Sequence, residues 1–233
     1  MAEVYGRYRG AGPALVPACG FDYVPGDLGV AVAAEELGRR PEEVDVVYAM
    51  AGGAATRGTA RSGLGAVASM RPRVGRLDVP GAVTAVRVPW GEELTVPLHQ
   101  PQAVVRTGIA APGWATRVAQ AVGPVSPYAQ PLVRLARPLL ERLVERMPEG
   151  PTEEQRGMTV SSTWSVARAG SDEVRVRVDV RDAYGMTARF LVAASQQVEG
   201  VGALATAEAL PARAFLDELS YEDEGGSLSW RVL

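Results

Sequence analysis

The chain has 233 residues, of which 47% are hydrophobic and 22% charged, and this is the composition of a folded protein, not of a disordered one. Its net charge of −3 argues against a dedicated nucleic-acid binder. With one cysteine, one histidine and no lysine, the sequence excludes an internal disulfide, a multi-cysteine zinc site and Schiff-base chemistry on a lysine.

The first part of the chain reads as helix, strand, helix, strand. Residues 1–9 predict a short helix, and the compact apolar run Ala14–Cys19 predicts a buried strand. Asp27–Leu37 predicts a helix that Asp27 caps, and Glu43–Met50 predicts a second strand. This order is typical of an α/β unit.

The middle of the chain alternates turn residues with short runs of strand-forming residues. A helix is expected at Gly58–Met70, and strands at Val83–Val88, Leu94–Leu98 and Ala103–Ile109. Pro131–Met147 predicts an amphipathic helix, with leucines on one face and charged residues on the other. Such a helix suits a membrane surface or a protein contact, and its glutamates favour a protein or dimer contact.

The last part contains the clearest pattern, a β-hairpin. Val160–Val166 alternates in polarity, Gly170 and Ser171 form a turn, and Val174–Val180 alternates valine with charged residues. One face of the hairpin is therefore expected in the core and the other in solvent. Two helices and a final strand are expected to follow, at Tyr184–Val198, Thr206–Leu219 and Ser227–Leu233.

Together these patterns predict an α+β fold: a residual βα unit of Rossmann type, then a mixed, largely antiparallel sheet with helices packed on one face. We assign residues 1–40 to the C-terminal part of a dinucleotide-binding domain and 41–233 to an α+β domain for substrate binding and dimerisation. The polar first ten residues and the short apolar runs predict a cytoplasmic protein without a membrane span.

The most informative segment is Cys19–Asp27, C-G-F-D-Y-V-P-G-D, between the first predicted strand and its helix. Ligands of α/β sheets collect at the carboxyl ends of strands, and helix N-termini attract anions. Gly20 permits close approach of the backbone to a ligand, and Asp22 and Tyr23 supply polar groups. A plain strand-to-helix turn explains the same residues.

This segment resembles the G-F-D-S-x-P-S-D-L-G block of the saccharopine dehydrogenase-like oxidoreductases, which include trans-acting enoyl reductases. Thr56–Ser62 is similar to the family's G-T-x-x-S helix start, and Tyr184–Ala188 resembles its G-Y-x-x-T-A segment. The three blocks occur in the family's order and span about residues 14–220. This chain departs from the pattern at Tyr23 and Gly26, where the family more often has serine.

The resemblance implies hydride transfer from NADP(H) or NAD(H) to a C=C or C=N bond of a small or acyl substrate. Tyr23 and Asp22 would then be the catalytic residues, with Tyr23 donating a proton to the carbanion. Four residues would lie on the cofactor side: Gly20, Phe21, Pro25 and Asp27.

A second candidate site lies in a stretch that has five arginines and no acidic residue, residues 46–77. Guanidinium groups and helix N-terminal amides suit a phosphate of a cofactor or of an acyl carrier. A solvated basic surface explains the same charges. The residues assigned to substrate or anion binding are Arg57, Gly58, Thr59, Arg61 and Tyr184.

Members of the family begin with a glycine-rich phosphate loop and most of a Rossmann sheet, and nothing similar precedes residue 13. We therefore expect a truncated or split enzyme, partnered by its substrate and by a second copy or a separate Rossmann segment. Two alternatives remain: a non-catalytic or repurposed binding domain, and a cofactor-free isomerase or cyclase that uses Asp22, Tyr23 and Asp27. Cys19 and His99 read as structural residues, and no metal is expected.

Overall fold

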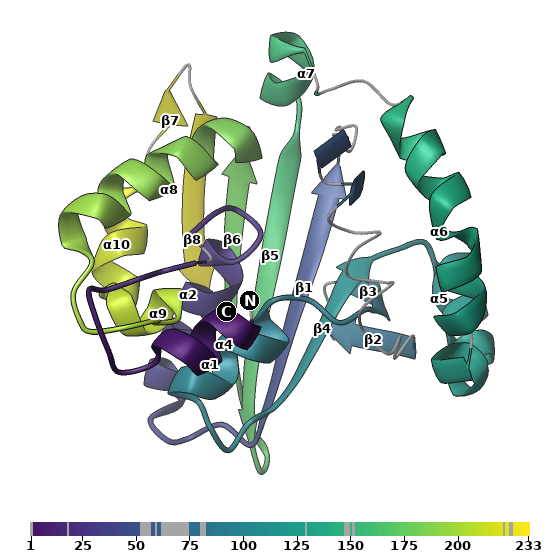
Figure 1. Cartoon of the computed structure of the whole chain (residues 1–233). Coiled ribbons are helices and arrows are strands. Elements are labelled where there is room, and N and C mark those ends of the chain that lie inside the picture. The colour runs from purple at the N-terminus through teal and green to yellow at the C-terminus, as the bar shows by residue number, and fades with distance from the viewer. Residues whose placement is uncertain are drawn as a thin grey trace.

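The structure is a computed structural model that describes residues 2–17, 19–51, 57–58, 60–61, 75–79, 83–128, 130–146, 150, 152–220, 222–223 and 226–233. Its centre is an eight-stranded sheet in the order β2-β3-β4-β1-β5-β6-β8-β7 (Figure 1). The strands are β1 Glu43–Ala51, β2 Gly75–Val79, β3 Val83–Arg87, β4 Val104–Ala110, β5 Val160–Ala169, β6 Asp172–Arg181, β7 Glu222–Asp223 and β8 Gly226–Val232. Only β1 and β4 pair in parallel among these strands, so the expected mixed, largely antiparallel sheet is confirmed.

Helices surround this sheet and complete the expected α+β fold (Figure 1). They are α1 Ala2–Tyr8, α2 Val24–Leu37, α4 Glu92–His99, α5 Gly113–Val122, α6 Gln130–Glu145, α7 Glu153–Gly157, α8 Ala183–Gln197, α9 Thr206–Ala209 and α10 Ala212–Glu218, with a 3₁₀ helix, η1, at Gly123–Tyr128. Helix α2 packs across β5 and β6, and α5 packs on β2 and β3. Among the described segments, no helix is long and apolar enough to cross a membrane.

The main core forms where α2 lies between the sheet and a layer of shorter helices. Helix α2 contacts β5 and β6 on one side and α4, α9 and α10 on the others. A helix covered in this way is buried on almost all sides, which agrees with its apolar sequence. A Cβ on Gly29 would lie 2.5 Å from Ser165 Oγ, so this close approach of helix and strand requires glycine. The core also joins residues on both sides of residue 40, where we placed the domain boundary.

The β5–β6 hairpin forms as the alternation predicts. Its strands end at the pair Ala169 and Asp172, and Gly170 adopts a left-handed φ of +59° in the turn. On one face, Val176, Val178 and Val180 are buried. On the opposite face, β6 carries charged residues that form ion pairs, whereas Trp164 and Val166 of β5 are buried in a second hydrophobic cluster.

The same face of the sheet holds a buried carboxylate, Asp45 of β1. Its side chain is 2% exposed and accepts hydrogen bonds from Arg106 of β4, at 2.6 Å, and from Arg168 of β5. Two guanidinium groups therefore neutralise one buried negative charge, and the three side chains link three neighbouring strands.

Two predicted strands are wrong. Ala14–Cys19 forms no strand among its described residues: Leu15 makes only an isolated bridge to Ala203 and is 38% exposed. This run is apolar but has only one short segment to pair with, so no ladder forms. Leu94–Leu98 lies within helix α4, because the helical form buries Glu92, Thr95 and Val96 against neighbouring elements.

The boundaries of other helices also differ from the predicted ones. Helix α2 begins at Val24, with Tyr23 as its N-cap residue, so Asp27 lies in the first turn and does not cap the helix. The left-handed Gly38 ends it as expected. Three helices lie where no helix is expected from the sequence: α5 and η1 after residue 112, and α7 before the hairpin. Of the helix expected at Gly58–Met70, residues 58, 60 and 61 are helical and the others lie outside the described residues.

Candidate functional site

The Gly20–Tyr23 turn packs onto the sheet. Phe21 is buried, and its ring meets that of Tyr48 on β1 edge to face, with centroids 6.1 Å apart. The carbonyl of Asp22 accepts hydrogen bonds from the Tyr48 hydroxyl at 3.1 Å and from Trp90 Nε1 at 3.2 Å. Since Tyr48 lies near the carboxyl end of β1, the turn covers the end of the only parallel strand pair described.

The same turn contacts the start of α8. The backbone N–H of Phe21 donates to Thr187 Oγ1 at 3.0 Å, and a Cβ on Gly20 would meet the Thr187 methyl at 3.5 Å. The Thr187 hydroxyl in turn donates to the carbonyl of Ala183 at 2.8 Å. The structure thus brings together two sequence blocks, Cys19–Asp27 and Tyr184–Ala188, whose contacting residues are 166 positions apart in the chain.

Beneath the turn lies an acid that the sequence analysis missed, Glu92. Its side chain is fully buried at the first residue of α4, and its Oε1 hydrogen-bonds to the Tyr48 hydroxyl. The other oxygen, Oε2, is buried and has no hydrogen-bond partner among the described residues. A Cβ on Gly26 would overlap both Glu92 Oε1 and the Tyr48 hydroxyl, so glycine leaves the space that this pair occupies.

The number of protons available for hydrogen bonds indicates the protonation state of Glu92 and Tyr48. The Tyr48 hydroxyl has one proton but faces two acceptors, the Asp22 carbonyl and Glu92 Oε1. Both contacts are satisfied if neutral Glu92 donates to Tyr48 and Tyr48 donates to Asp22. The pKa of Glu92 is raised to about 8, mainly by burial; the Tyr48 hydrogen bond opposes this rise, and the charges of Asp27 and Asp22 add to it. Glu92 is therefore mainly a neutral acid at pH 7.

Tyr23 is held by a glycine on the neighbouring segment. A Cβ on Gly91 would overlap the ring of Tyr23, so the ring lies directly on the Gly91 backbone. The Tyr23 side chain is half-buried, whereas that of Asp22 is exposed. Burial raises the pKa of the Tyr23 phenol, and the nearby Glu92 and Asp22 charges add to this effect. The phenol consequently stays protonated across the neutral range.

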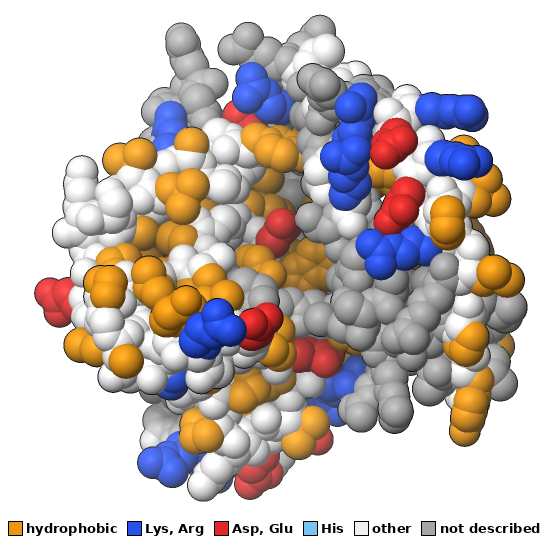
Figure 2. Space-filling view, in the orientation of Figure 1, with side chains coloured by type: hydrophobic (Ala, Val, Ile, Leu, Met, Phe, Trp, Pro, Cys, Tyr) orange, Lys and Arg blue, Asp and Glu red, His pale blue; other side chains and the backbone are white. Residues whose placement is uncertain are grey.

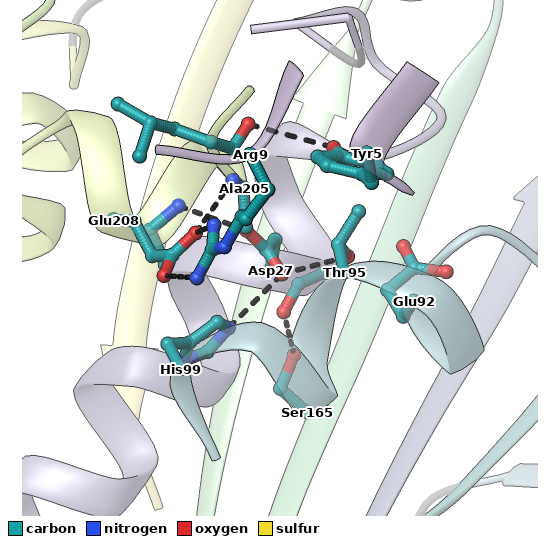
Figure 3. A network of polar contacts seen from close by, with 12 residues as sticks. Tyr5, Arg9, Asp27, Glu92, Thr95, His99, Ser165, Ala205 and Glu208 are labelled. Carbon is teal, nitrogen blue, oxygen red and sulfur yellow. Dashed lines mark hydrogen bonds and ion pairs between the residues drawn. The ribbon is translucent and has the colours of Figure 1, made fainter. Parts of the chain in front are cut away.

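Asp27, which was expected on the cofactor side of the site, lies in the interior between helices. Its carboxylate is fully buried and joins three helices (Figure 3). Oδ1 accepts hydrogen bonds from Thr95 Oγ1 at 2.8 Å and lies 3.1 Å from His99 Nε2, both on α4. Oδ2 accepts from the backbone N–H of Ala207 on α9 at 2.8 Å. Asp27 thus serves as a buried junction and does not face solvent in this structure.

An ion pair extends this polar network to the first helix. Arg9, just after α1, makes a two-pronged contact with Glu208 of α9, with N–O distances of 2.5 and 2.6 Å, and donates to the Ala203 carbonyl at 3.1 Å (Figure 3). Glu208 also accepts from the backbone N–H of Ala205 at 2.9 Å. The N-terminal segment is therefore fixed to α9 by hydrogen bonds as well as by packing.

The structure separates the residues that we expected to form the cofactor side. Gly20 is partly exposed, whereas Phe21, Pro25 and Asp27 are buried. Cys19 is buried as well, and burial raises the pKa of its thiol, which agrees with a structural role. The surface of the turn is thus formed by Gly20, Asp22 and Tyr23, while the other three residues hold it in place.

The expected anion-binding residues are described only in part. Arg61 forms an exposed ion pair with Glu145 of α6 at 3.7 Å. Arg57 and Gly58 lie in a helical turn, and Thr59 is outside the described residues. Tyr184 is 40% exposed on α8, where the Asp182 side chain caps the helix by accepting the Gly185 N–H at 3.1 Å.

The described part of the chain also has a surface hollow of about 360 Å³. It lies between α8 and the end of α10 and is lined by residues that include Arg189, Val192 and Leu219. Among the described side chains, no three His, Cys, Asp or Glu residues gather closely enough to hold a metal ion.

Glu92, Tyr48 and Trp90 are the residues of this site that the sequence analysis missed. A signal for Glu92 was present, because glycine followed by two glutamates marks the start of a helix. The alternation of Leu94, Val96 and Leu98 suggested a strand instead, and this placed Glu92 in a turn. For Tyr48 and Trp90 the sequence offers no such signal, since their role depends on where the Asp22 carbonyl lies.

Comparison with known proteins adds no assignment to this geometry. No profile of a known protein family matches the chain, and no curated protein sequence matches it.

Proposed function

We propose that this chain forms the substrate side of a reductase site that uses NADP(H) or NAD(H) to reduce a C=C or C=N bond. The observation that supports this most strongly is the contact between Phe21 and Thr187, which joins two of the three blocks that resemble the saccharopine dehydrogenase-like oxidoreductases. The contact of the turn with Tyr48, the last β1 residue that pairs with β4, supports it as well, because α/β sheets bind ligands at the carboxyl ends of strands.

The chain's own contribution is the proton. When a reduced nicotinamide supplies a hydride to one carbon of the double bond, the electron pair left on the other atom requires a proton. Tyr23 supplies it from its phenol, whose raised pKa keeps it protonated at neutral pH. Asp22, exposed on the adjacent residue, exchanges protons with solvent and restores the phenol.

The dinucleotide fits this chain only at its nicotinamide end. The described residues include no glycine-rich loop between a strand and a helix, which is the element that binds a pyrophosphate in Rossmann folds. In this proposal a separate Rossmann segment holds the pyrophosphate, while the Gly20–Tyr23 turn of this chain contacts the nicotinamide and the substrate.

Titration with NADPH tests this proposal. Trp90 contacts the turn through the Asp22 carbonyl, and tryptophan emission is quenched by energy transfer to a nearby reduced nicotinamide. We expect saturable quenching at about millimolar NADPH, because this chain contacts only the nicotinamide end of the dinucleotide. The quenching should be lost in Trp90→Phe and kept in Trp114→Phe, because Trp114 is exposed on α5. If NADPH at millimolar concentration leaves Trp90 emission unchanged, the oxidoreductase proposal fails and a repurposed binding domain becomes the better description.

A further inference from the structure

Three consecutive residues at the N-terminus of α4 are connected to the turn. Trp90 donates its indole N–H to the carbonyl of Asp22 at 3.2 Å, and the backbone of Gly91 lies under the ring of Tyr23. The third residue, Glu92, reaches the turn indirectly, through a tyrosine of β1. It is also the one of these three residues whose side chain can change its charge.

The hydroxyl of Tyr48 lies between Glu92 and the turn. It contacts Glu92 Oε1 on one side and the carbonyl of Asp22, 3.1 Å away, on the other. A phenol has one proton and a carbonyl oxygen only accepts, so Tyr48 donates to one of these two oxygens at a time. Tyr48 therefore has two hydrogen-bonding arrangements, and the proton on Glu92 selects between them.

The two arrangements hold the turn differently. When Glu92 is protonated, it donates to the Tyr48 oxygen, and Tyr48 donates to the Asp22 carbonyl. When Glu92 is ionised, its carboxylate is the stronger acceptor, because hydrogen bonds to ionised groups are about twice as strong as neutral ones. Tyr48 then donates to Glu92, its oxygen and the Asp22 carbonyl face each other as two acceptors, and the carbonyl keeps Trp90 as its donor.

The surroundings of Glu92 favour its neutral form. The side chain is fully buried, and Oε2 has no hydrogen-bond partner within the described part of the chain. The charges that act on it from packed elements are the carboxylates of Asp22 in the turn and Asp27 in α2, and both are negative. The neighbouring phenols, Tyr48 of β1 and Tyr23 of the turn, also become negative if they ionise. Mainly because of burial, the pKa of Glu92 is raised to about 8.

We propose that Glu92 is a proton-dependent latch on the turn and acts through Tyr48. The protonated acid holds the turn by the bond from Tyr48 to Asp22, and the ionised acid removes this bond while Trp90 and Thr187 keep their own contacts with the turn. Loss of the proton thus loosens the turn without detaching it. Asp22 is exposed, and Figure 2 shows acidic side chains near the centre of the view, where the turn crosses the sheet in Figure 1. The latch therefore changes a part of the surface.

The consequence for catalysis rests on the proposed function. Tyr23, the proposed proton donor, directly follows Asp22, and its ring lies on Gly91. A loosened turn moves this phenol away from its place beside the substrate. Turnover should then fall as the pH rises above about 8 in the wild type, and this fall should be absent in Glu92→Gln.

Carbon-detected NMR of the Asp22 carbonyl tests the latch itself. Asp followed by Tyr occurs once in the sequence, so labelling Asp carbonyls with ¹³C and Tyr nitrogens with ¹⁵N gives a single signal. A carbonyl that loses a hydrogen bond shifts upfield, and we expect one such step with its midpoint near pH 8. In Glu92→Gln the signal should stay at its low-pH position, because the glutamine amide donates to Tyr48 as the neutral acid does. In Tyr48→Phe it should stay at its high-pH position.

Two control variants separate the latch from neighbouring ionisable groups. Asp22→Asn removes the carboxylate of the observed residue, and its carbonyl is labelled as selectively because the sequence has no asparagine of its own. This variant should keep the step at a slightly lower pH, since the Asp22 charge favours neutral Glu92. His99→Gln removes the ring that pairs with Asp27, and it should keep the step as well.

Two results would overturn the proposal. One is a wild-type signal that shows no step between about pH 6 and 10 while circular dichroism shows the protein folded. The other is a step near pH 8 that persists in Glu92→Gln, and either result decides even where Tyr48→Phe fails to fold. The NMR measurement needs no NADPH. Its failure would leave the reductase proposal standing, and a failure of NADPH to bind would leave the latch standing.

Discussion

Tyr48 and Glu92 share a hydrogen bond at a point where the sheet, the Gly20–Tyr23 turn and α4 meet. Tyr48 comes from β1 and Glu92 from the start of α4, and both are buried. Because the Tyr48 hydroxyl also holds the Asp22 carbonyl, the protonation state of Glu92 is coupled to the position of the turn.

Protonation of Glu92 should make stability depend on pH. Its pKa rises from an ordinary value of 4.5 to about 8 on folding, so the folded state binds the extra proton between these two values. Unfolding free energy is therefore greatest below about pH 4.5 for this group and falls as pH rises toward 8, by up to about 4 kcal/mol. Glu92→Gln should remove this decline, as urea denaturation at several pH values would measure.

The neighbouring glutamate provides the control. Glu93 is only partly buried and hydrogen-bonds to Thr107, so Glu93→Gln should retain the decline with pH. If Glu92→Gln and the wild type lose stability in parallel between pH 5 and 8, Glu92 is not the source of the decline in unfolding free energy.

Gly91→Ala should displace Tyr23. Its Cβ would overlap the Tyr23 ring, so the ring or the backbone must move. We expect a loss of about 1–3 kcal/mol in unfolding free energy, and slower proton transfer if Tyr23 is the donor. Gly6→Ala in α1 is the control, since a Cβ there meets nothing within 4 Å and alanine favours the helix by up to about 1 kcal/mol. Equal stability of the two variants would contradict the contact.

Asp27→Ala should be among the most destabilising substitutions in the chain. It leaves Thr95, His99 and the Ala207 N–H without their buried acceptor, at a cost of about 3 kcal/mol or more. Chemical denaturation of Asp27→Ala beside Asp172→Ala checks this, because the Asp172 pair with Arg39 is exposed and should contribute less than about 1 kcal/mol. Similar losses for both variants would show that the junction is not needed.

Thr187→Val should loosen the turn while leaving α8 intact. Valine has the shape of threonine but cannot accept the Phe21 N–H, so we expect a loss of about 1–2 kcal/mol and faster hydrogen exchange at the Phe21 amide. Ser195→Ala is matched to it, since Ser195 lies on the same helix and donates to the Val192 carbonyl of its own turn. An unchanged exchange rate at Phe21 in Thr187→Val would exclude the contact between the two blocks.

Much of the fold was predictable because the signals are local. The β5–β6 hairpin follows from valines that alternate with charged residues, and α2 ends at Gly38, which adopts the left-handed conformation that favours glycine. Where local signals conflicted, the prediction was wrong. Leu94–Leu98 alternates like a strand but folds as a helix, because only the helix buries Glu92 and Thr95 together.

The candidate site was likewise predictable only where local sequence signals marked its residues. The sequence alone identified the Gly20–Tyr23 turn and the block at Tyr184–Ala188, and it excluded disulfide and lysine chemistry for the whole chain. The tertiary structure decided that Phe21 meets Thr187 and that Asp27 is a buried junction. It also decided that Glu92 lies under Tyr48. The physical reason is that periodicity reports only which side of an element is apolar, whereas the ionisation of a buried acid depends on neighbours that distant segments supply.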